Sequence, residues 1–206
     1  MSAFEFSFTF YGLVLGLAVV ELVAGIGRLV HEGHRIRVGW LTPMLATFLA
    51  LDVATFWNQA WSTNQNAPFS LALLILGVTS AGLFYIAATL VFPRQIEEGE
   101  DLTAHYWRHR RLVLSLVAVA NLLNLGLGTV LEYATAPDWF WPGILQMAGF
   151  AAVMFAAAFL PRGRIAVACL ILVLAINVAS VVWDAVALVN AGAWELVYAG
   201  AGGPPE

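Results

Sequence analysis

Long apolar segments separated by short polar breaks dominate the hydrophobic pattern of this chain. A helix needs about 20 apolar residues to cross a hydrocarbon core about 30 Å thick. Six segments reach that length, at about 8–30, 40–61, 69–92, 112–133, 140–160 and 165–190. None shows the period-two alternation of a barrel strand, and only helices and closed barrels satisfy their backbone in lipid. The pattern therefore predicts an all-α membrane protein, a bundle of six transmembrane helices.

The composition argues against a water-soluble globular protein. Of the 206 residues 61% are hydrophobic and only 11% are charged, too few charges to coat a surface that faces water. We expect one transmembrane domain over 1–198, followed by a flexible Gly- and Pro-rich tail over 199–206. The lipid bilayer is the expected surrounding, and nucleic acid is excluded because the net charge is −4 and the basic residues are confined to short connections.

The arginines predict the orientation. All nine basic residues are arginines, and they lie at the first, third and fifth connections: Arg28, Arg35, Arg37, Arg94, Arg108, Arg110, Arg111, Arg162 and Arg164. The positive-inside rule assigns this side to the cytoplasm, so both termini are expected outside it. The use of arginine without lysine, together with abundant alanine, glycine and valine, suggests a bacterial source and hence the inner membrane.

A weak internal repeat at an offset of 99 residues relates the two halves. Gly27, Trp40 and Pro43 correspond to Gly126, Trp139 and Pro142 at that offset. Three helices per unit would make the halves inverted relative to each other, as in many transporters. Chance alignment of leucine-rich spans explains the match equally well.

Polar and acidic residues inside the predicted spans are the candidate functional site. A carboxylate at the bilayer centre costs at least about 2.5–3.5 kcal/mol, so such residues usually face the bundle interior or water. Helical spacing groups Asp52, Thr55 and Gln59 on one face, and the same spacing recurs on three other helices. The predicted proton-relay residues are Glu21, Asp52, Asn121, Asn124, Asn177 and Asp184.

These residues favour a proton-linked transporter or a channel-like protein with a site at the membrane midplane. Hydrogen bonding between helices is the plainer alternative, and it would fit a structural or assembly subunit of a membrane complex. A GxxxG pair, Gly12 and Gly16, allows close helix approach within the chain or in a homodimer.

A third hypothesis, a membrane enzyme or metal sensor, rests on histidines at the arginine-rich side. Asp101, His105 and His109 recur at intervals of four residues, a spacing that can hold a metal ion on one helix face. A pH-sensing cluster or an ordinary surface are the alternatives. Catalytic motifs are absent from the sequence and no cofactor is indicated, so an enzyme is the less favoured class.

The basic stretch Arg108, Arg110 and Arg111 has two interpretations. It would attract anionic lipid headgroups, or it would serve only to set the topology.

Overall fold

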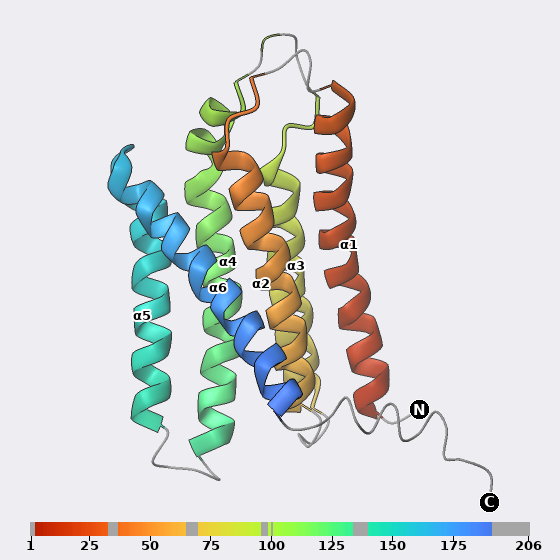
Figure 1. The fold of residues 1–206 in the computed structure, drawn as a ribbon. Coiled ribbons are helices and arrows are strands. Elements are labelled where there is room, and N and C mark those ends of the chain that lie inside the picture. The colour runs from red at the N-terminus through yellow and green to blue at the C-terminus, as the bar shows by residue number, and fades with distance from the viewer. Residues whose placement is uncertain are drawn as a thin grey trace, which may run out of the picture.

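Six helices follow one another along the chain, one in each of the segments that the hydrophobic pattern predicted (Figure 1). The structure, a computed structural model, describes residues 3–32, 37–64, 70–95, 99, 101–133 and 140–190. The helices are α1 (Ala3–Glu32), α2 (Leu41–Asn64), α3 (Leu71–Val91), α4 (Leu102–Tyr133), α5 (Phe140–Phe159) and α6 (Arg164–Asn190). The all-helical prediction is therefore confirmed.

Five of these helices are long and apolar enough to cross a membrane, and α2 is the exception. The sequence predicted residues 40–61 as a span like the others. Helix α2 occupies this segment, and its crossing of the membrane stays a prediction. Helix α2 has the length, but Asp52, Asn58 and Gln59 lower its hydropathy. Polar residues are tolerated in this position because α2 contacts four other helices, α1, α3, α4 and α6, rather than lipid alone.

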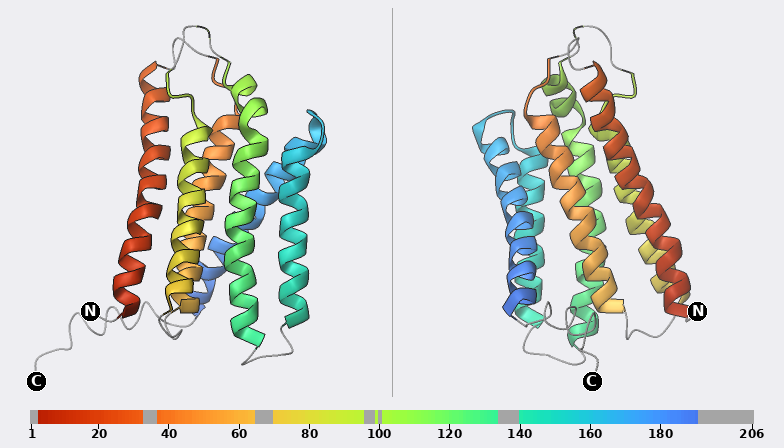
Figure 2. Two further views of the ribbon diagram at one scale, coloured as in Figure 1. Left: turned by 180° about the vertical axis from the view of Figure 1, so that it is seen from behind. Right: turned by 45° about the vertical axis from the view of Figure 1, so that its right-hand side comes forward.

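The helices are arranged as three neighbouring pairs, seen most clearly in the right-hand view of Figure 2. Helices α1 and α3 pack together on one side, α2 and α4 lie in the middle, and α5 and α6 form the other side. Helix α1 contacts only α2 and α3 among the described helices. The core between the pairs combines large side chains such as Phe48 and Phe84 with alanines that permit close approach.

Large apolar side chains also cover the outside of the bundle. Val30 is 81% exposed, Leu145 74% and Trp183 75%. A surface of this kind is unfavourable in water but matches hydrocarbon, so the helical bundle fits a multi-pass membrane protein.

Helix α4 is longer than a span requires, because it begins outside the apolar segment that starts at Leu112. The Asp101 carboxylate accepts a hydrogen bond from the backbone N–H of Thr103 at 2.8 Å, so Asp101 is the N-cap of α4. A single β-bridge joins Arg37 to Asp101, and Thr42 Oγ1 donates to the buried carbonyl of Leu102 at 2.8 Å. These contacts fix the start of α4 beside the start of α2.

The predicted repeat is not confirmed by the packing. Helix α1 packs along α3, whereas the corresponding helices of the second half, α4 and α6, make no contact among the described residues. The beginning of α1 and the end of α6 lie at the same end of the bundle (Figure 1). The predicted tail, 199–206, falls outside the described residues.

Candidate polar site between α2, α4 and α6

Polar side chains from three helices meet along one face of α2, and we call this set the polar seam. Its members are Asp52, Thr55, Asn58 and Gln59 of α2, Asn121 and Asn124 of α4, and Asn177 and Asp184 of α6. The seam starts near the middle of α2 and extends about 10 Å toward the end opposite Arg37, since a helix rises about 1.5 Å per residue.

Asp52 is the most deeply placed acid of the seam, with only 3% of its surface exposed. Its Oδ2 accepts a hydrogen bond from Nδ2 of Asn121 at 2.7 Å. Asn177 contacts Thr55, which lies one turn along α2 from Asp52. Among the described residues no arginine or histidine forms an ion pair with Asp52. Asp52 is therefore a desolvated carboxyl held by an amide rather than by a counter-charge.

The rest of the seam consists of hydrogen bonds from α2 to the two neighbouring helices. Thr55 Oγ1 lies 3.2 Å from Oδ1 of Asn177 and 3.0 Å from the carbonyl of Asp52. Asn124 donates to Gln59 Oε1 at 3.3 Å, linking α4 to α2. The face predicted from Asp52, Thr55 and Gln59 is therefore a real contact surface of α2.

Asp184 joins the seam at its more exposed end. Its Oδ2 accepts a hydrogen bond from Nδ2 of Asn58 at 3.4 Å. Sequence reasoning missed Asn58, although its spacing of three residues from Thr55 places it beside the predicted stripe.

Glu21 does not join the seam. Its Oε1 pairs with the Arg28 guanidinium at 3.3 Å, and the two side chains are 30% and 32% exposed. Both residues lie on α1, a helix that contacts neither α4 nor α6. The structure therefore does not bring all the predicted proton-relay residues into one site. Glu21 is paired with Arg28 on α1, outside the polar seam.

The histidines of α4 contact backbone carbonyls. His105 Nε2 lies 3.2 Å from the carbonyl oxygen of Leu90 in the last turn of α3, and His109 Nδ1 lies 3.1 Å from the carbonyl of His105. The centroids of the two imidazole rings are 4.2 Å apart. The Asp101 carboxylate caps the start of α4 instead of joining the two histidines. Within the described ranges no three His, Cys, Asp or Glu side chains form a group that could hold a metal ion. A metal role for Asp101, His105 and His109 stays a prediction.

Arg110 belongs to the basic stretch of the sequence, but its side chain is buried, at 2% exposure. Its guanidinium donates to the carbonyls of Ala157 and Leu160 at the end of α5. The sequence spacing could have predicted this burial. Arg110 follows Leu102 and Tyr106 at intervals of four residues, so it lies on the same core-facing side of α4.

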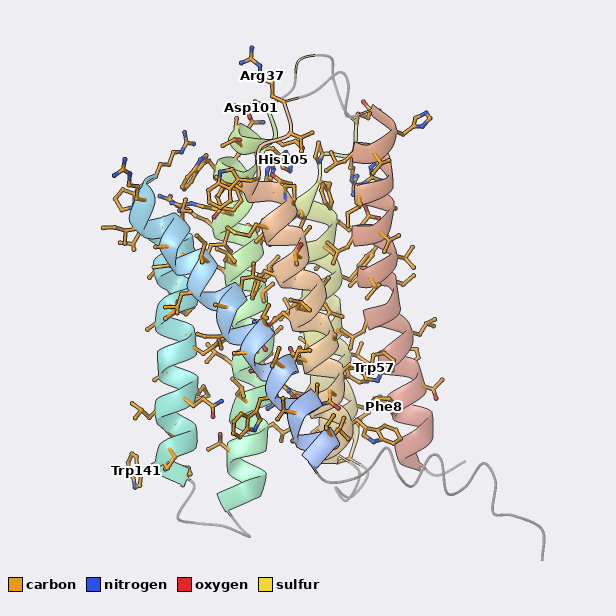
Figure 3. All side chains as sticks on the ribbon, viewed as in Figure 1. Phe8, Arg37, Trp57, Asp101, His105 and Trp141 are labelled. Carbon is orange, nitrogen blue, oxygen red and sulfur yellow. The ribbon has the colours of Figure 1, made fainter. Side chains whose placement is uncertain are left out.

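The two ends of the bundle differ in the side chains labelled in Figure 3, which are charged or polar at one end and aromatic at the other. Arg37, Asp101 and His105 lie at one end, and Phe8, Trp57 and Trp141 lie toward the other (Figure 3). The polar seam runs from the interior toward this second, aromatic end. No protein-family model, curated protein or solved structure matches the chain.

Proposed function

We propose that the chain is a small polytopic inner-membrane protein that acts as a proton-linked transporter or channel-like protein. Asp52 is the group that takes up and releases the proton, and Asn121, Asn124, Asn177 and Asp184 line the path toward the aromatic end. The observation that carries the proposal is the burial of Asp52 without a basic partner among the described residues. Buried acids at membrane depth usually mark ion or proton pathways.

The hydrogen bond to Asn121 gives the two protonation states of Asp52 different effects. A charged carboxylate accepts the Asn121 amide, which strengthens the contact between α2 and α4. A protonated acid carries its own donor and holds the amide less tightly. Proton uptake at Asp52 therefore loosens the central pair of helices, which is the coupling that a transporter requires.

Glu21 is left out of this path. Its carboxylate is paired with Arg28, and its helix does not contact α4 or α6. This separation makes Glu21 a matched control, since its replacement removes one carboxyl from the same bundle at a different place.

The test is proton uptake into liposomes that contain the purified protein, followed with a trapped pH-sensitive dye under an imposed membrane potential. We expect Asp52→Asn to reduce the uptake rate to that of protein-free liposomes. Asparagine keeps the shape of the side chain and an oxygen that accepts from Asn121, so the fold is retained while the titrating group is lost. Glu21→Gln is expected to keep the wild-type rate.

Two results would contradict the proposal. One is an Asp52→Asn rate equal to that of the wild type. The other is a wild-type protein that transfers protons no faster than empty liposomes.

A structural or assembly subunit is the second candidate, and a specific observation favours it. The three acids lie in separate contacts: Asp52 with Asn121, Asp184 with Asn58, and Glu21 with Arg28. Interhelical hydrogen bonds in membranes average about 0.6 kcal/mol, so a seam of this kind serves as helix-to-helix bonding. In that case neither the wild type nor Asp52→Asn moves protons, and the two proteins are equally stable.

A further inference from the structure

A pocket with four arginines lies at the end of the bundle opposite Phe8, Trp57 and Trp141 (Figure 3). It has a volume of about 340 Å³ and is lined by Trp107, Arg108, Arg110, Arg111 and Arg162. The first four belong to the beginning of α4, and Arg162 belongs to the connection between α5 and α6. We call it the basic pocket. Its size is at the lower end of the range for ligand sites.

Within the part of the chain that the structure describes, no carboxylate neutralises the charges of the basic pocket. Its lining contains no carboxylate, and among the described residues none of its arginines forms an ion pair, since the salt bridge found there joins Arg28 to Glu21. Four like charges around one cavity repel each other, and an anion between them removes that repulsion.

Two of the guanidinium groups are held in position by other contacts. Arg110 is anchored on the carbonyls of Ala157 and Leu160, and it lies 4.4 Å from the centre of the Trp107 ring. Arg111 lies 6.0 Å from the centre of the Phe159 ring. Planar guanidinium forks that are already ordered suit the oxygens of a phosphate group, because little further entropy is lost on binding.

The surroundings of the basic pocket indicate the source of the phosphate. Leu112, Phe159 and Ile165 are exposed apolar side chains, each within a few residues of the pocket lining. The pocket lining therefore adjoins the ends of the apolar segments of α4, α5 and α6, where lipid headgroups are expected. A molecule with a phosphate and attached hydrocarbon chains would contact both surfaces, whereas a free anion would use only the first.

We propose that the basic pocket binds the phosphate of an anionic phospholipid, with the acyl chains against Leu112, Phe159 and Ile165. This inference does not depend on proton transfer at Asp52, because the basic pocket and the polar seam share no residue.

The test is native mass spectrometry of the full chain, released from mixed vesicles of phosphatidylglycerol and phosphatidylcholine. We expect preferential retention of phosphatidylglycerol by the wild type. Arg111→Gln and Arg162→Gln should each weaken this binding about tenfold, since a hydrogen bond to a charged group contributes on that scale. Arg110 is left unchanged because it also anchors α5.

The matched control is Arg94→Gln, which removes an exposed arginine that does not line the pocket. It should retain phosphatidylglycerol as the wild type does. Equal retention of the two lipids would overturn the proposal, as would an equal loss in Arg94→Gln. A separate arm adds inorganic phosphate without lipid: tight binding of phosphate alone would overturn the lipid assignment, and weak binding supports it.

Discussion

At the scale of single residues, glycines in α1 create the space that aromatic rings of neighbouring segments occupy. A Cβ on Gly25 would lie 2.7 Å from Cγ and 2.8 Å from Cε2 of the buried Phe92 ring. Gly12 faces the Trp57 ring of α2 in the same way, so this member of the GxxxG pair is used within the chain. Gly16 and Gly27 have no such neighbour.

We predict that Gly25→Ala lowers the free energy of unfolding by about 1–3 kcal/mol, the usual cost of overpacking a core. Unfolding of the detergent-solubilised protein by SDS, followed by circular dichroism, measures the change. Gly27→Ala is the control and should be neutral or slightly stabilising, because alanine favours a helix and the site is open. Equal losses in both variants would show that the Phe92 contact is not the cause.

Residue-level chemistry was only partly predictable from the sequence. Helical spacing correctly grouped Asp52, Thr55 and Gln59, because residues three and four apart share a face whatever surrounds them. Spacing carries no information about which faces meet. For that reason the sequence combined Glu21 with Asp52, and it did not find that Asn121 is the residue beside the Asp52 carboxyl.

At the scale of helices, the beginning of α4 supports the ends of two neighbours. The last carbonyls of a helix have no partner inside it, and basic side chains are favoured there by the helix dipole. His105 contacts the Leu90 carbonyl at the end of α3, and Arg110 binds the carbonyls of Ala157 and Leu160 at the end of α5. The polar start of α4 is thus a structural clamp on α3 and α5.

Removal of this clamp should loosen the end of α5. We predict that Arg110→Leu increases amide hydrogen exchange in the segment 156–163 about tenfold or more, because each hydrogen bond to a charged group contributes about 1.5–3 kcal/mol. Exchange followed by mass spectrometry measures it. Arg108→Leu, which removes an exposed arginine from the same turn, should leave this segment unchanged. Unaltered exchange in Arg110→Leu would rule out the clamp.

At the scale of the whole molecule, the charge difference between the two ends predicts the orientation in the membrane. Arg37 lies at the end where α2 and α4 begin, and Trp141 lies at the other (Figure 3). Arg94 follows the end of α3, where Leu90 contacts His105 near the start of α4. The positive-inside rule directs the arginine end to the cytoplasm.

Single-cysteine labelling tests this orientation in intact bacteria. In a Cys169→Ala background, we expect a membrane-impermeant maleimide to label Trp141→Cys without further treatment. Arg94→Cys should react only after the membrane is permeabilised. The opposite order of labelling would reverse the proposed orientation and place both termini in the cytoplasm.

The number and location of the helices could be predicted from the sequence, because each is a long, mainly apolar segment between polar or helix-breaking residues. Their arrangement could not. The order of packing depends on surfaces such as the ring of Trp57 against Gly12, and the predicted equivalence of the two halves does not extend to contacts between α4 and α6. The polar face of α2 indicated an interior position, but not which four helices surround it.

The position of α2 has a consequence for biosynthesis. A segment with Asp52, Asn58 and Gln59 gains little from entering the bilayer alone, since each such residue opposes partitioning into hydrocarbon. Its polar partners on α4 and α6 are synthesised later than α2 itself. We therefore expect α2 to be stable in the bilayer only after α4 and α6 have been synthesised.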